Sequence, residues 1–484
     1  MRLSTAYRAF TASREHDTHG RFIMLNAKIA ASSLLFAALI LAAPSAQAAP
    51  TTEAFRLRLP VVDMPYDFAY GYRAPSMEQA LSLSVDAYEV TVDLCGRLAG
   101  RVGKKRRWLE ELVGYGCTDA SIPFSVFLPP FSNWAHEEAH RAVLGRYGID
   151  SKNGVYAFDI SSTVAVNGVR DEDLIWLKAH HPADMVRLHM AGAEIQNLIG
   201  VRLVDDAFFF GKTSAHLGPV AFSARRQAPI SFFLWFHQLL YFAASSSGAF
   251  DADINTLGAK EKTVKDRDFS GPDYTAWARD MFRPDEPYAA RGAHPSGVGI
   301  QRYVRSSDLT RDERDFLSTQ TALHFVNLID PAMFGIQGFD ISSSTRFSAA
   351  LSHQLAPFGY DMGAILRLRT HGVRVAARLH DYVRSEGWLP GIEARIVEHA
   401  VRVGNVSLYV TPRVGAFVQP EGLAFRGARA KPGGYVGVGL DVPIVPWLRW
   451  SFNMMAKSAG WVQGVEYMNA AVTANVGAAI VVPD

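Results

Sequence analysis

The sequence predicts an α+β multidomain protein in which a mainly helical part, residues 49–340, is followed by an antiparallel β part, residues 341–484. Two observations lead to this fold class. Apolar residues recur at helical spacing up to about residue 340 and at alternate positions beyond it, and these two periods distinguish helices from strands. Hydrophobic residues make up 49% of the chain and charged residues 20%, so both parts have enough apolar residues to fold.

The N-terminus has the pattern of a secretory signal peptide over residues 1–48. Lys28 precedes an apolar run at 29–43, and Ala46-Gln47-Ala48 is a small-x-small cleavage site. We therefore expect an exported chain that begins at Ala49, with Met24 as an alternative start of the precursor because residues 1–23 are unusually polar. Without residues 1–48 the chain has 44 Lys and Arg against 45 Asp and Glu, a formal charge of −1 that gives no reason to expect a nucleic-acid partner.

The two cysteines, Cys95 and Cys117, both survive this cleavage. In an exported chain the leading interpretation is one disulfide between them, and the alternative is two separate buried thiols.

Helix signals divide the first part of the chain. Capping and breaking residues place helices at 76–102, 132–144, 182–200, 230–244 and 310–330, the last with the capping box Thr310-Arg311-Asp312-Glu313. The run at 230–244 is apolar nearly all round but covers only roughly 22 Å, so we interpret it as a buried helix, with a membrane-dipping helix as the alternative. Residues 251–307 are rich in charge, Gly and Pro and are predicted to form a long loop region.

The second part reads as successive strands. Apolar and polar residues alternate in 363–369 and 373–379, and Thr370-His371-Gly372 between them predicts a tight hairpin. Similar runs continue to Val482 and give about eight strands, each with an apolar face and a face of Arg, Gly, Asn and Thr. This pattern resembles outer-membrane proteins, so we predict that residues 341–484 form an antiparallel β-barrel in contact with outer-membrane lipid. The alternative is a soluble sandwich or barrel whose apolar face is its core.

The predicted helix at 132–144 carries the residues that specify a chemistry. In His136-Glu137-Glu138-Ala139-His140 the two histidines lie four apart on one face, so both imidazoles can bind one metal ion with Glu137 beside them. In this H-E-x-x-H motif the chain resembles the zincin family of zinc metallopeptidases. The metzincin subclass is excluded because it requires Gly and His where the chain has Val143 and Arg146.

A catalytic zinc ion needs a third protein ligand and one open position. The resemblance to gluzincins, which take a Glu from a later helix, implies Glu194 as that ligand. A lone acid among Met, Ala, Ile and Leu is also costly to bury unless it is paired or binds a metal. The alternatives are His180, His181, His189, Asp205 and Asp206, the last two by similarity to intramembrane site-two-type peptidases.

The resemblance also implies a mechanism. Zinc would lower the pKa of a bound water to about 7, and Glu137 would take its proton as general base. His189, His294 and Tyr303 are candidates for stabilising the oxyanion, and Glu138 points to another face. We therefore predict zinc-dependent peptide hydrolysis in the bacterial cell envelope, with the helical part in the periplasm and an envelope peptide or protein as substrate. The alternative is a non-enzymatic outer-membrane barrel, a channel or structural protein, whose His pair is structural.

Overall fold

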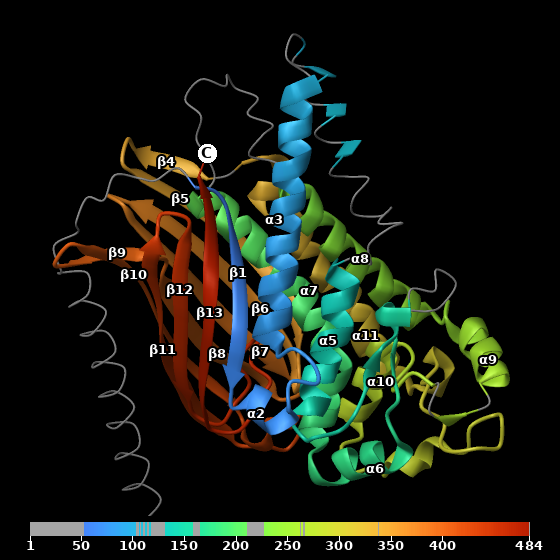
Figure 1. The fold of residues 1–484 in the computed structure, drawn as a ribbon. Coiled ribbons are helices and arrows are strands. Elements are labelled where there is room, and N and C mark those ends of the chain that lie inside the picture. Colours follow the sequence, from blue (N-terminus) through green and yellow to red (C-terminus); the bar gives the residue numbers. More distant parts are fainter. Residues whose placement is uncertain are drawn as a thin grey trace, which may run out of the picture.

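A computed structural model describes residues 53–102, seven residues between 106 and 117, residues 131–157, 165–210, 227–336 except 262, 265 and 266, and residues 338–483. The predicted signal peptide lies outside these residues. The described chain combines helices with a large antiparallel sheet, as predicted, and the sheet curves so that its concave side faces the helices (Figure 1).

The helices match most of the helix signals. Helices α3, α5, α7, α8 and α11 confirm the five predicted from the sequence, and the capping box is present because the Thr310 and Glu313 side chains each accept the other's backbone N–H. The predicted long loop at 251–307 is wrong in part, since it contains α9 and α10. None of the described helices combines the length and hydropathy needed to cross a bilayer. The helices are α2 (Tyr66–Tyr70), α3 (Met77–Val102), α5 (Phe131–Gly145), α6 (Asp171–His180), α7 (Pro182–Phe210), α8 (Gln227–Ser247), α9 (Asp251–Lys260), α10 (Asp273–Phe282) and α11 (Arg311–His324).

The large sheet has eleven strands, more than the eight expected, because the short strands β4 and β9 and the early strand β1 were not recognised. Its order is β1-β13-β12-β11-β10-β8-β7-β6-β5-β4, with β9 paired to β10, and a separate small sheet joins β2 (Lys152–Asn153) to β3 (Val166–Asn167). The strands are β1 (Glu53–Met64), β4 (Phe339–Ser342), β5 (Thr345–Ala356), β6 (Gly359–Thr370), β7 (Val373–Arg384), β8 (Gly387–Ile396), β9 (His399–Val403), β10 (Val406–Pro420), β11 (Ala430–Val445), β12 (Leu448–Lys457) and β13 (Ala471–Pro483).

The sheet is open, which corrects the prediction of a closed barrel. Its two edges are β1 and β4, and they do not pair with each other in the described residues. Closure would require hydrogen bonds between these edges, but helices occupy the space between them. Helix α3 packs along β1, and α7 and α11 pack against β5 near the other edge.

The boundary predicted near residue 341 falls close to the start of β4 at Phe339. The two parts are nevertheless joined, because a strand from the first part belongs to the sheet of the second. Strand β1 lies at the beginning of the helical part and pairs with β13 in antiparallel register from Glu53↔Pro483 to Met64↔Ala474. The first and last described strands are therefore neighbours. The disulfide between Cys95, near the end of α3, and Cys117 is confirmed.

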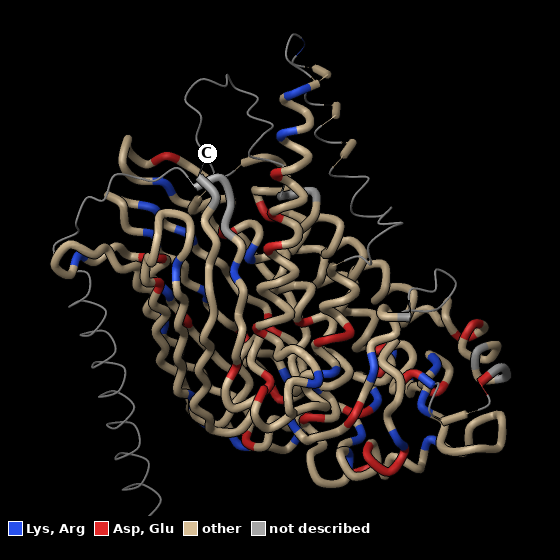
Figure 2. Tube along the Cα trace, in the orientation of Figure 1, with Lys and Arg blue, Asp and Glu red and all other residues tan. Residues whose placement is uncertain are grey.

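Polar side chains on the concave face of the sheet contact helix α7. Asp205 accepts hydrogen bonds from Arg367 on β6 at 2.6 Å and from Arg395 on β8 at 2.5 Å. Asn197 donates to Gln354 on β5 at 2.9 Å. Charged residues are concentrated in the helical part of the molecule (Figure 2).

Candidate metal centre

Helix α5 holds the two histidines of the motif. The helix begins at Phe131, one residue before the predicted start at 132. Its start is fixed by α3, because the Ser132 N–H donates to the Tyr88 hydroxyl at 3.1 Å. His136 and His140 lie on one face with ring centroids 4.8 Å apart, as the spacing predicts.

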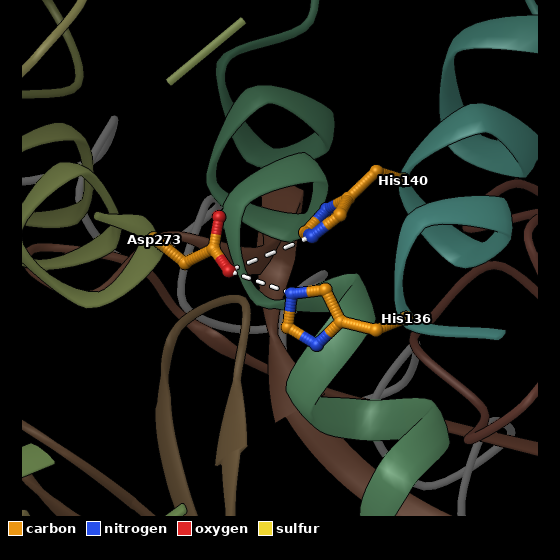
Figure 3. A group of neighbouring side chains, drawn as sticks. All are labelled: His136, His140 and Asp273. Carbon is orange, nitrogen blue, oxygen red and sulfur yellow. Dashed lines mark hydrogen bonds and ion pairs between the residues drawn. The ribbon is translucent and has the colours of Figure 1, made fainter. Parts of the chain in front are cut away.

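Asp273, the first residue of α10, completes a three-residue group with these histidines. Its Oδ2 lies 2.9 Å from His136 Nε2 and 3.6 Å from His140 Nε2, and the three groups point toward one another (Figure 3). One ligand atom from each residue lies within 4.8 Å of the others. The Ser270 hydroxyl donates to Asp273 Oδ1 at 3.2 Å, which leaves Oδ2 for the histidines.

The hydrogen bond on the other side of the His140 ring assigns its tautomer. Nδ1 lies 2.5 Å from the Leu188 carbonyl oxygen, so Nδ1 carries the hydrogen and Nε2 presents a lone pair. That Nε2 is buried without a hydrogen-bond partner and faces the Asp273 carboxylate. Two acceptors that face each other at this distance repel unless a cation lies between them. A backbone carbonyl on the distal nitrogen is also the usual partner of a metal-binding histidine.

His136 fits against a glycine of α7. A Cβ atom at Gly192 would lie 2.4 Å from His136 Nε2 and Cδ2, a distance that real Cβ atoms do not tolerate. The small residues before Glu194 therefore allow α5 to approach α7 closely. At Gly192 the space is filled by the His136 ring. His136 Nδ1 is buried and lacks a partner in the structure.

The donor set fits a zinc ion. Two imidazole nitrogens and one carboxylate oxygen are one of the three-ligand sets that hold catalytic zinc, and other divalent transition metals accept the same donors. Burial alone would raise the pKa of Asp273, but positive charge on protonated imidazoles of His140 and His136 lowers it well below its usual range, and a metal ion bound to the neutral rings would act in the same direction. Asp273 is therefore an anion suited to a cation.

Glu137 lies beside this group on α5 and is only 7% exposed. Burial, together with the nearby carboxylates Asp268 and Asp273, raises its pKa to about 8, against the opposing effect of His136. A bound divalent cation would counter this rise, because it is the largest local charge in such a site.

Glu138 is buried and hydrogen-bonded on the side of α5 away from the metal centre. Both of its oxygens accept hydrogen bonds from Arg141 Nη1, at 2.8 and 2.7 Å. Asn153 on β2 also donates to it at 2.8 Å. This buried carboxylate therefore anchors α5 to the small sheet.

The structure does not group Glu194, the expected third ligand, with the histidines. The Glu194 carboxylate accepts hydrogen bonds from Arg187 at 2.9 Å, from the Gly464 N–H at 2.8 Å and from Trp461 Nε1 at 3.3 Å. Residues two apart on a helix differ by about 200° in direction, so Glu194 points away from the side on which Gly192 meets His136. The cost of burying Glu194 is therefore offset by its ion pair with Arg187 and not by a metal ion.

The alternative ligands contact other residues, and His181 packs against the rings of Tyr147 and Trp176. His189 Nε2 lies 2.9 Å from Asp280, and Asp205 binds the arginines of the sheet. Among the residues proposed for the oxyanion, His294 pairs with Glu261 and Tyr303 donates to Glu261. His180 Nδ1 contacts the Trp176 carbonyl, and Asp206 pairs with Arg58.

Sequence reasoning missed Asp273 because it assigned residues 251–307 to a loop. A local signal was present, since Pro272 followed by an acid is typical of a helix start. A comparison of the chain with protein families, curated proteins and solved structures finds no match.

Proposed function

We propose that the protein is an exported zinc-dependent hydrolase that cleaves peptide bonds of cell-envelope substrates. The observation that carries this proposal is the convergence of His136 Nε2, His140 Nε2 and Asp273 Oδ2 beside Glu137. The third ligand in this proposal is Asp273 in place of Glu194. The envelope as its location is supported by the signal-peptide pattern and by the disulfide.

Each residue has a defined part in the proposed reaction. Zinc, when bound, would polarise the substrate carbonyl and acidify a water molecule. The Glu137 carboxylate takes a proton from that water and passes it to the amide nitrogen that leaves. Leu188 holds the His140 ring through Nδ1, and Ser270 holds the Asp273 carboxylate through Oδ1.

Replacement of Glu137 by Gln tests this function. The amide keeps the size of the side chain but cannot accept the proton, so we expect cleavage of a fluorescently labelled unfolded protein to fall by roughly 100-fold or more. The bound metal should remain, because Glu137 is not a ligand in the proposal. Glu172→Gln, at an exposed position of α6, is the matched control and should retain full activity.

Two results would contradict the proposal. One is a Glu137→Gln variant that cleaves the substrate at the rate of the wild type. The other is cleavage by the wild type that continues unchanged after its metal has been removed with a chelator.

A further inference from the structure

Helices cover the polar face of the large sheet and leave its apolar face exposed. A sheet in a soluble protein has the opposite arrangement. On β12 the alternate residues that point to the concave, helix-covered side are Arg449, Ser451, Asn453, Met455 and Lys457, four of which are polar. The residues between them, Leu448, Trp450, Phe452, Met454 and Ala456, point outward, and Met454 is 55% exposed. The polar face is therefore covered and the apolar face is bare.

This apolar face extends over most of the sheet. The register places Leu351, Ala364, Leu379, Ile392 and Ala416 directly opposite one another from β5 to β10, so they form one row on one face. A second row follows through Val414, Val436, Ala456 and Val472, from β10 to β13. Leu351, Leu379, Ile392, Val436 and Val472 are between 44% and 64% exposed. A single soluble protein rarely exposes an apolar surface of this extent.

The curvature of the sheet decides what can cover this surface. Helices lie on the concave side of the sheet (Figure 1), so the rows of exposed residues lie on its convex side. A rigid partner or a second copy of the convex face would contact only a few strands at a time. A fluid hydrocarbon phase can contact all of them.

The dimensions and the ends of the surface fit a bilayer. The outward residues of β12 span nine positions, within the roughly 9–11 residues with which a tilted strand crosses the hydrocarbon of a bilayer. Trp388, at the start of β8, and Trp447, just before β12, are 67% and 54% exposed. Successive strands are antiparallel, so these two tryptophans lie at opposite ends of the surface, where interfacial aromatic residues are expected.

We propose that the convex face of the sheet, from β5 to β13, is embedded in the hydrocarbon of a lipid bilayer although the sheet is not a closed barrel. The concave polar face needs no water-filled channel, because helix α7 meets its arginines. This inference does not depend on the proposed hydrolase, since it uses none of the residues of the metal centre.

A thiol-reactive fluorophore tests the proposal in the full chain. Cys95 and Cys117 are the only cysteines and are joined in a disulfide, so an introduced cysteine is the single free thiol. Met454→Cys places the probe on β12, and Leu379→Cys repeats the test on β7. Val298→Cys is the control, because Val298 is 50% exposed but lies outside the sheet. Each labelled protein is reconstituted into phosphatidylethanolamine and phosphatidylglycerol vesicles, with nitroxide groups on the acyl chains as quencher.

We expect the lipid quencher to reduce the fluorescence at positions 454 and 379 by at least about twofold and to leave position 298 unchanged, whereas aqueous iodide should quench only position 298. Quenching of positions 454 and 379 by iodide and not by lipid would overturn the proposal. A water-soluble dimer in which these two positions are shielded from both quenchers would overturn it as well, because the face would then be an interface between copies.

Discussion

Gly192 on α7 lies directly against the His136 ring, and a Cβ atom at this position would lie within 2.4–2.5 Å of three ring atoms. The backbone of a buried helix cannot retreat by the required distance, so a larger residue must displace the imidazole. The position of His136, a candidate metal ligand, is therefore set by the absence of a side chain at Gly192 on the neighbouring helix.

Gly192→Ala should displace the His136 ring and weaken the metal centre. We expect the affinity for zinc to fall by roughly 10–100-fold, the range found when the residues that support a metal ligand are changed. Titration with a competing chelator measures it. Gly100→Ala on α3 is the control, because nothing lies within 4 Å of its added Cβ. Equal zinc affinity in the wild type and in Gly192→Ala would show that the His136 ring does not need this position.

Glu194→Gln separates the two candidates for the third ligand. The substitution leaves the guanidinium of Arg187, whose side chain is fully buried, without its anion. Breaking a buried ion pair in this way costs about 3–5 kcal/mol, so the midpoint of thermal unfolding should fall clearly. The metal content should be that of the wild type. A loss of metal without a loss of stability would instead support Glu194 as a ligand.

A pH dependence is expected from Glu466, in the segment between β12 and β13. Burial raises its pKa from 4.5 to about 7, with Arg187 and Arg146 opposing the rise. Between these two values the folded chain holds a proton that the unfolded chain has lost, so the contribution of Glu466 to stability falls as the pH rises from about 4.5 to about 7. Above that range both states are ionised and the contribution is constant.

Glu466→Gln should remove this contribution. The midpoint of thermal unfolding, measured at about pH 5 and about pH 8, should change less in the variant than in the wild type. Glu172→Gln, which is exposed, should follow the wild type. If the variant and the wild type lose the same amount of stability over this range, Glu466 does not titrate as described.

The histidine pair could be predicted from the sequence because a helix turns local spacing into geometry. Asp273 could not be paired with it in this way. It follows His140 by 133 positions, and only the packing of α10 against α7 brings it close. The choice of Glu194 correctly recognised an acid that needs compensation, but Arg187, two helical turns earlier on the same face, provides it.

The sheet shows the same limit. Alternation predicted which residues of each strand share a face, and the hairpin between β6 and β7 is where Thr370-His371-Gly372 predicted it. Alternation does not specify whether the first and last strands of a sheet meet. The sheet stays open because β1, which is far from the other strands in sequence, forms one of its edges and because helices pack beside both edges.

The metal content of the purified chain is the most direct test of a metal centre formed by His136, His140 and Asp273. Elemental analysis after dialysis should find about one zinc ion per wild-type chain and less than about one tenth of that in Asp273→Asn. Asparagine preserves the size of the side chain, so circular dichroism should show that the variant is folded. A wild-type chain without stoichiometric metal, or an Asp273→Asn variant with the wild-type amount, would contradict the account.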